Sequence, residues 1–184
     1  IDINMGCPDK NVMKQGAGAS CMKDPDNAVA LIQAAKEGVE DAGKTIPVSV
    51  KTRLGFNEDV LEEWLPKLLS AEPAVLTLHA RTKKDMSKVP ARWERVKRAV
   101  EIRDELGSKT LIIGNGDAID MKDAQSKAKE SGCDGVMFGR AVFGNPWLFD
   151  KEKKSITVEA KLDAALDHTR EFLKFWSDRK SFEL

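Results

Sequence analysis

The sequence contains no apolar run that approaches the roughly 20 residues needed for a membrane-spanning helix. It shows no basic segment followed by an apolar one, so we expect no secretory leader and no membrane partner. The three cysteines are odd in number and lie in dissimilar contexts, which is not the pattern of a disulfide framework. These absences predict a protein of the reducing cytoplasm.

A net charge is also absent, because 30 basic residues balance 30 acidic ones, and neutrality gives no general argument for a nucleic-acid partner. One local bias exists between Arg81 and Arg98, where eight basic residues accompany two acidic ones. A solvated helix face explains this stretch better than a phosphate-binding surface. The two histidines, His79 and His168, lie far apart, and no cysteine pair has zinc spacing, so we expect no metal site.

What the chain does contain is typical of a globular protein with one sizeable core: 184 residues, 33% charged and 41% hydrophobic. Strand patterns alternate with helix patterns, and the loops between them are short. The gaps between successive strands suit right-handed crossovers, which predicts an α/β fold with a parallel sheet. The predicted strands are Ile1–Asn4, Pro47–Lys51, Ala74–Leu78, Thr110–Ile113 and Asp134–Phe138.

Helix signals fill the gaps between these strands. Asp24 and Pro25 predict a capped helix start, Asn57 is expected to cap the next helix, and Pro66 to kink it. A charged linker over Asp150–Ser155 leads to a last helix near Val158–Trp176, and no further strand follows. We therefore predict a catalytic domain over residues 1–149, and a linker with the start of a C-terminal helical region over residues 150–184.

Two architectures fit this alternation, an open doubly wound sheet and part of a TIM (β/α)8 barrel. Every predicted strand ends in polar residues, whereas an open sheet concentrates functional groups at one switch point, so the pattern favours the barrel. A complete barrel has eight strands and this chain has five, so we predict a partial barrel whose first three strands are missing. We expect a dimer or the missing segment to cover the open sheet edge.

Glycines follow the last two predicted strands, in the segments Ile113–Asp117 and Phe138–Ala141. In barrels these two loops often bind phosphate, because glycine lets backbone N–H groups approach the anion. Arg140 adds a guanidinium that can hold two phosphate oxygens. A Gly-X-Gly segment alone would indicate an ordinary turn, but two glycine-bearing strand ends on adjacent strands favour a phosphate site.

Two further side chains end predicted strands. Lys51 is either a lysine that reaches out to solvent or a cation beside an electron-rich ligand. His79 is either a structural residue or a donor that faces a ligand.

Cys7 lies between Gly6 and Pro8, which fix the backbone of the loop after the first strand. The thiol can be a nucleophile, a proton donor or a small apolar group. No histidine motif adjoins it, which disfavours a nucleophilic hydrolase. A neutral thiol can give a proton to a developing carbanion.

Together these residues resemble the tRNA-dihydrouridine synthase family, whose members reduce a uridine of tRNA with a flavin. The resemblance runs from Ile1 to about Phe149, and its motifs occur in the family's order. They are Ile1–Pro8 (IDINMGCP), Lys14–Ala19 (KQGAGA), Asp24-Pro25, Val50–Gly55 (VKTRLG), Leu78–Thr82 (LHART), Gly114–Asp117 (GNGD), Gly135–Ala141 (GVMFGRA) and Gly144–Trp147 (GNPW).

The resemblance implies an oxidoreductase in which FMN binds across the barrel mouth and NADPH reduces it. Lys51 would contact the isoalloxazine ring, and His79 would lie against the cofactor. Cys7 would protonate C5 of uracil after hydride reaches C6. The ribityl phosphate would be held by Asn115, Gly116, Asp117, Gly139 and Arg140.

The implied substrate is tRNA, with the target base out of its stack. Asn4 would contact the substrate, and Arg53 and Arg81 would meet RNA phosphates. Two alternatives stay open: a dihydroorotate-dehydrogenase-like flavin enzyme acting on a free pyrimidine, and a truncated, non-catalytic half-barrel that binds RNA or another chain.

Overall fold

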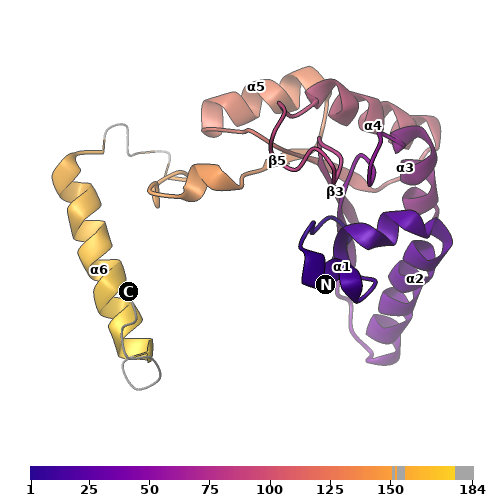
Figure 1. Ribbon diagram of the computed structural model, residues 1–184, viewed down its shortest axis with the longest axis horizontal. Coiled ribbons are helices and arrows are strands. Elements are labelled where there is room, and N and C mark those ends of the chain that lie inside the picture. The colour runs from indigo at the N-terminus through magenta and orange to yellow at the C-terminus, as the bar shows by residue number, and fades with distance from the viewer. Residues whose placement is uncertain (151, 153–155, 177–184) are drawn as a thin grey trace. The chain divides into compact units, whose positions relative to one another are not determined.

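The structure is a computed structural model that describes residues 1–150, 152 and 156–176 (Figure 1). The chain divides into two compact units, residues 1–140 and residues 141–184, which are described separately. The predicted domain boundary after residue 149 stays a prediction. Most of the predicted linker, residues 151 and 153–155, lies outside the described residues.

The first unit is built on a parallel sheet whose strands neighbour one another in chain order. An open doubly wound sheet reverses its strand order at a switch point, whereas a (β/α)8 barrel keeps chain order around its wall. The order confirms the predicted α/β class and agrees with five consecutive units of a barrel. The strands are β1 (Asp2–Asn4), β2 (Ser49–Arg53), β3 (Val75–His79), β4 (Leu111–Asn115) and β5 (Gly135–Met137).

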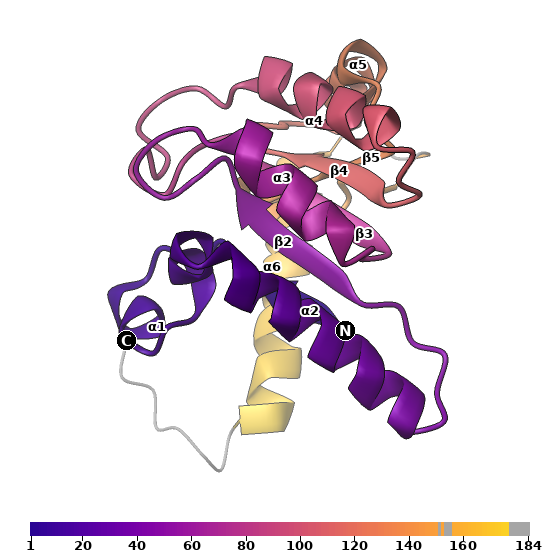
Figure 2. The same ribbon diagram turned by 90° about the vertical axis from the view of Figure 1, so that its right-hand side faces the viewer.

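Four helices connect these strands and lie on one face of the sheet, as Figure 2 shows. Two short elements, α1 (Lys10–Lys14) and η1 (Gly18–Lys23), precede the first of them. Successive long helices pack against one another in chain order. They are α2 (Pro25–Asp41), α3 (Leu61–Ser70), α4 (Trp93–Glu105) and α5 (Met121–Ser131).

The starts of two helices can be compared with the capping residues that the sequence predicted. Asp24 caps α2 as predicted, because its carboxylate accepts a hydrogen bond from the Asn27 N–H at 3.1 Å. The predicted cap by Asn57 is wrong: α3 begins only at Leu61, whose N–H donates to Asp59 Oδ1 at 3.2 Å. The β2–α3 connection is therefore longer than the helix pattern indicated.

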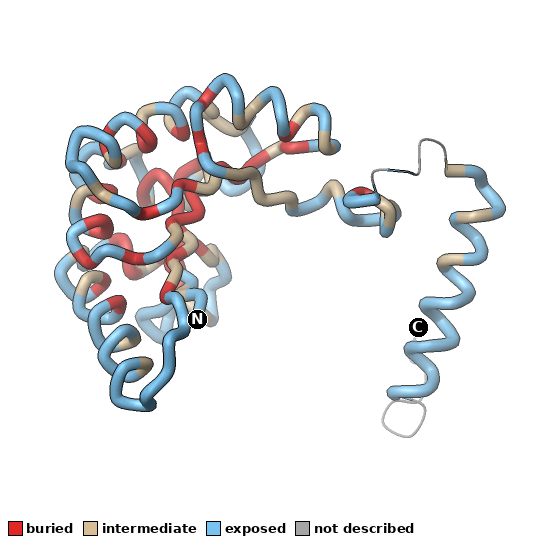
Figure 3. The backbone as a smooth tube through the Cα atoms, turned by 180° about the vertical axis from the view of Figure 1, so that it is seen from behind, coloured by how far each residue is buried: buried red, intermediate tan, exposed pale blue. Residues whose placement is uncertain are grey.

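The hydrophobic core fills the space between the sheet and its helices. Val50, Leu76 and Ile112 are neighbours across β2, β3 and β4, and each is fully buried. Trp64 of α3 is also buried, and its indole N–H donates to Thr52 Oγ1 at 3.0 Å, which satisfies the one polar group that it brings into the core. Buried segments in Figure 3 accordingly follow the strands and the inward sides of the helices.

The opposite face of the sheet is largely open in the first unit. Asp2 of β1 and Leu111 of β4 lie in one register row on this face. Asp2 is exposed, and Leu111 is 46% exposed. Parallel sheets usually have both faces covered. The open face matches the prediction of an incomplete barrel wall, and its cover by a dimer or by a missing segment stays a prediction.

The second unit carries the final helix, α6 (Val158–Trp176), with the bounds that the sequence predicts. Leu162, Leu166, Phe172 and Trp176 recur along it at helical spacing and are exposed. None of the helices in the described part of the chain combines the length and the apolar composition needed to cross a bilayer.

Candidate active site at the carboxyl edge of the sheet

The parallel strands bring five predicted site residues to one edge of the sheet. Arg53, His79 and Asn115 are direct neighbours at the ends of β2, β3 and β4. Asn4 and Lys51 are neighbours on β1 and β2. Side chains alternate between faces along a strand, so Lys51 and Arg53 share a face, and that face is the open one.

The loop that carries Cys7 is held by three hydrogen bonds. Oδ1 of Asn4 accepts hydrogen bonds from the N–H groups of Gly6, at 3.1 Å, and Cys7, at 3.0 Å. The Ala19 N–H donates to the Cys7 carbonyl at 2.9 Å. Cys7 is a free cysteine of intermediate exposure, and these hydrogen bonds hold its backbone in place. Asn4 thus shapes the loop with its side-chain carbonyl, and its contact with a substrate stays a prediction.

Gly18 is a residue of this loop system that the sequence did not single out. Its φ of +60° is left-handed, and a Cβ at this position would lie 2.7 Å from the Cys7 carbonyl oxygen. Only glycine fits both the conformation and the close approach. The only feature of the sequence that could have indicated Gly18 is its place in the glycine-bearing motif after Cys7.

Arg53 connects the Cys7 loop to the loop after β3. The residue is 8% exposed, and its Nε donates to the Gly6 carbonyl at 2.8 Å. Its Nη1 donates to the Thr82 carbonyl at 3.2 Å. Burial and the neighbouring charge of Arg81 lower the pKa of Arg53, although the group stays charged at neutral pH. A contact between Arg53 and RNA phosphate stays a prediction, and the structure adds a clear role in holding the loops.

Arg81 is even less accessible, at 3% exposed. Its Nε donates to the Val89 carbonyl at 2.6 Å, its Nη1 lies 3.2 Å from His79 Nε2, and its Nη2 pairs with Asp117 at 2.5 Å. All three guanidinium nitrogens therefore have protein partners. The predicted phosphate contact of Arg81 is untested, and it would require these bonds to break.

The bond from Arg81 fixes the protonation of His79. A guanidinium can only donate, so Nε2 of His79 accepts and the ring proton lies on Nδ1. Burial, followed by the charges of Arg53, Lys51 and Arg81, lowers the pKa of His79 to about 3. At neutral pH the imidazole is uncharged and has an N–H to offer a ligand.

Lys51 faces the same open side of the sheet. It is half-buried, and no hydrogen bond or ion pair joins its ammonium group to another of the described residues. Burial and the charge of Arg53 lower its pKa, while Asp2 opposes that shift. A partly desolvated cation without a partner is suited to an electron-rich or anionic ligand.

The predicted phosphate residues lie at the ends of β4 and β5. Asn115 donates from Nδ2 to the Met137 carbonyl at 2.9 Å, which joins the two strand ends. Gly116 has φ of +129°, and a Cβ there would lie 2.7 Å from Ala91 Cβ. A Cβ at Gly139 would meet open space, and the Arg140 side chain is 70% exposed. The structure brings these residues together, and their contact with phosphate stays a prediction.

Asp117 makes contacts that its motif did not predict. Its carboxylate accepts from the Ala91 N–H at 2.9 Å and pairs with both Arg81 and Arg140. Burial alone would raise the pKa of Asp117, but the hydrogen bonds from Arg81 and Ala91 hold it below its usual value. A carboxylate repels phosphate, so we interpret Asp117 as the group that orients Arg140 rather than as a direct phosphate ligand.

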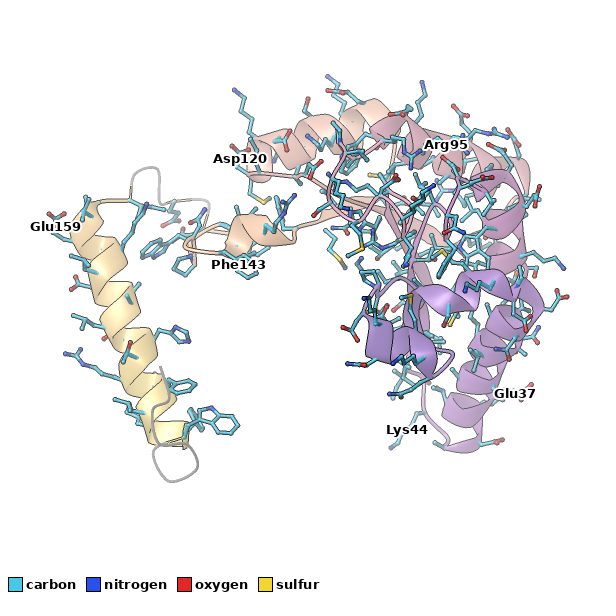
Figure 4. All side chains as sticks on the ribbon, viewed as in Figure 1. Glu37, Lys44, Arg95, Asp120, Phe143 and Glu159 are labelled. Carbon is cyan, nitrogen blue, oxygen red and sulfur yellow. The ribbon has the colours of Figure 1, made fainter. Side chains whose placement is uncertain are left out.

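The four arginines of the basic stretch after β3 pair with carboxylates, whereas its four lysines have no ion pair with the described residues. Arg95 of α4, labelled in Figure 4, is held by both oxygens of Asp59 at 2.9 and 3.0 Å. Further pairs join Arg81 to Asp117, Arg92 to Asp85, and Arg98 to Glu62 and Glu105. The described residues also contain no group of three or more side chains suited to a metal ion.

Comparisons with known proteins show the family of this chain. The family model described as "Dihydrouridine synthase (Dus)" matches residues 1–182. The chain belongs to the dihydrouridine synthase family. It is 43% identical over 179 residues to a "Probable tRNA-dihydrouridine synthase" of Staphylococcus aureus, covering 97% of this chain and 53% of that protein. The resemblance inferred from the motifs is therefore confirmed.

Other relatives show the same partial coverage. A "Probable tRNA-dihydrouridine synthase 2" of Bacillus subtilis is 43% identical over 164 residues, which is 89% of this chain and 49% of that protein. The chain thus spans about half the length of the curated relatives that it matches. Among solved structures, a 2,3-dimethylmalate lyase matches with a TM-score of 0.45 and 20% sequence identity. The match covers 83% of this chain and 55% of the lyase chain. The fold assignment rests on the strand order and not on this match.

Proposed function

We propose that this chain forms the larger part of the active site of an FMN-dependent enzyme that reduces uridine to dihydrouridine in tRNA. Support comes from the family membership and from one observation in the structure. The Cys7 thiol, the Lys51 ammonium and the Nδ1–H of His79 belong to neighbouring strand ends on one edge of the sheet. With tRNA as the substrate, the cytoplasm is the expected place of the reaction.

The residues at this edge fit FMN by their chemistry. Lys51 is a half-buried cation with no partner among the described residues, and His79 is a neutral donor, so both suit the polar edge of an isoalloxazine ring. Arg140 is an exposed guanidinium that Asp117 holds in place, beside open space at Gly139, which suits a phosphate. FMN reduced by NADPH would supply the hydride that adds to C6 of uracil.

The chain's own residues would then carry the proton. Cys7 presents a thiol on a loop fixed by Asn4 and Arg53, and it would protonate C5 of the ring as negative charge develops there. The Asn4 amide lies in the same loop and would orient the base by donating to a uracil carbonyl. His79, uncharged at neutral pH, would act as a hydrogen-bond donor and not as an acid.

The proposal is tested with the Cys7→Ala variant of the protein at its complete natural length, by measuring flavin binding and dihydrouridine formation. We expect the purified variant to keep its yellow flavin spectrum and to lose dihydrouridine formation in undermodified tRNA by about 100-fold or more, the usual range for a lost general acid. Cys133→Ser is the matched control, because Cys133 is buried at the start of β5 and its thiol contacts the Gly135 carbonyl.

Two results would count against the proposal. Undiminished dihydrouridine formation by Cys7→Ala would remove the thiol from the mechanism. A colourless wild-type protein after incubation with FMN would favour the alternative of a non-catalytic half-barrel, and reduction of free orotate but not of tRNA would favour a dihydroorotate-dehydrogenase-like enzyme.

A further inference from the structure

Two lysines lie over one phenylalanine ring at the carboxyl edge of the sheet. The Nζ of Lys23 is 4.1 Å from the ring centroid of Phe56, and the Nζ of Lys83 is 4.8 Å from it. The three residues come from the connections after β1, β2 and β3 respectively. Such connections leave the same edge of a parallel sheet, so this Lys23–Phe56–Lys83 cluster shares its edge with Cys7.

Backbone hydrogen bonds fix the two loops that carry Phe56 and Lys83. The Leu54 N–H donates to the Arg81 carbonyl at 3.1 Å, and the Lys83 N–H donates to the Gly55 carbonyl at 2.9 Å. The Lys84 N–H then donates to the carbonyl of Phe56 itself, also at 2.9 Å. The ring is therefore held in place before any ligand arrives.

Lys23 is fixed from the other side. It ends η1, the element whose Ala19 N–H bonds the Cys7 carbonyl and whose Cys21 and Met22 are buried in the core. The position of Lys23 is thus tied to the loop that carries the thiol. A ligand bound by Lys23 would lie on the same rim as the proposed reaction.

The charge of the cluster is uncompensated. No carboxylate of the described residues pairs with Lys23 or Lys83, whereas Arg92, Arg95 and Arg98 all have such partners. Two ammonium groups near one ring repel each other, and cation–π attraction at exposed sites is worth only about 0.5–1 kcal/mol for each. An anion between them would relieve this repulsion.

The geometry points to the Lys23–Phe56–Lys83 cluster as a contact for an RNA phosphate close to the target uridine, an inference that rests on the proposed function. Lysine binds phosphate as a point charge and reads no base, so the contact is independent of sequence. Both lysines lie over the ring of Phe56, so we assign the cluster to a phosphate contact and not to the stacking of a base.

The test compares two double variants of the FMN-loaded, full-length protein in tRNA-binding titrations over a range of salt concentrations. Lys23→Gln with Lys83→Gln should weaken binding roughly tenfold at moderate salt. It should also make the slope of log K against log salt shallower by about 0.7–0.9, the loss of one phosphate contact. FMN affinity should stay unchanged.

The matched control is Lys44→Gln with Lys109→Gln. Both control lysines are exposed, precede β2 and β4 at the opposite edge of the sheet, and have no ion pair among the described residues; Lys44 is labelled in Figure 4. This variant removes the same charge, so a slope equal to that of the wild-type protein is expected.

Three outcomes would overturn the inference. Equal slopes for the two double variants would show that the cluster does not contact phosphate, with the proposed function left standing. A Phe56→Leu variant that loses affinity at an unchanged slope would show base stacking instead. A wild-type protein that neither binds nor reduces tRNA would overturn the proposed function and the inference with it.

Discussion

Asp117 determines what the neighbouring arginines can do. It pairs with Arg81, which is 3% exposed, and with Arg140, whose side chain is 70% exposed. Of the two, only Arg140 can turn toward a ligand without leaving a buried position. The phosphate assignment at the ends of β4 and β5 therefore depends on Arg140.

Removing this guanidinium should weaken FMN binding selectively. For Arg140→Ala we expect about a tenfold rise in the dissociation constant for FMN, the lower end for a charged hydrogen bond because the side chain is exposed. Riboflavin, which lacks the phosphate, should bind the wild-type protein and the variant equally. Quenching of flavin fluorescence measures both ligands, and an equal loss for both would remove Arg140 from the phosphate site.

At the scale of single residues, the sequence predicted the positions of the site residues better than their hydrogen-bond partners. Arg53, Arg81 and Asp117 do lie at the carboxyl edge, but no sequence pattern predicted that the arginines would donate to the carbonyls of Gly6, Thr82 and Val89. Those partners come from other loops, and their approach depends on the packing of the whole edge. A charged residue at a strand end can serve the ligand or the fold, and only the contacts distinguish the two.

Among the elements, the loop from β1 to η1 depends on one glycine. Gly18→Ala should lower the free energy of unfolding by about 1–3 kcal/mol, because alanine disfavours the left-handed conformation and its Cβ would press on the Cys7 carbonyl. Urea unfolding measures the change. The control is Gly38→Ala in α2, where a Cβ meets open space and a gain of roughly 0.5–1 kcal/mol is expected.

The same two substitutions test whether the loop positions the thiol. Gly18→Ala should also slow uridine reduction, because the backbone of Cys7 must move to admit the methyl group, whereas Gly38→Ala should leave the rate unchanged. A Gly18→Ala protein as stable and as active as the Gly38→Ala protein would contradict the described role of Gly18.

Strands and helices were predictable because their signals are local. All five predicted strands exist, and their ends lie within two residues of the predicted ones. The start of α3 was not predictable, because Asn57 looks like a cap, whereas the connection continues to Asp59, whose carboxylate also binds Arg95 of α4. This contact between the β2–α3 connection and α4 is not local in sequence, and the local pattern placed the boundary earlier.

At the scale of the whole molecule, the chain order of the strands and the open face of the sheet are both features of a partial barrel. Helices cover one face, while Leu111 and Asp2 are exposed on the other. The chain matches about half the length of its curated relatives, so the active site is proposed for the protein at its natural length. The sequence predicted this incomplete wall from the number of strands alone.

The central claim is that these strand ends serve a flavin that reduces uridine in tRNA. It is tested most directly by a single turnover without oxygen, in which the full-length protein, reduced by NADPH and freed of excess NADPH, is mixed with undermodified tRNA. The flavin spectrum and the dihydrouridine content of the tRNA are followed together. We predict one dihydrouridine for each flavin reoxidised, whereas a flavin that stays reduced in the presence of tRNA would contradict the account.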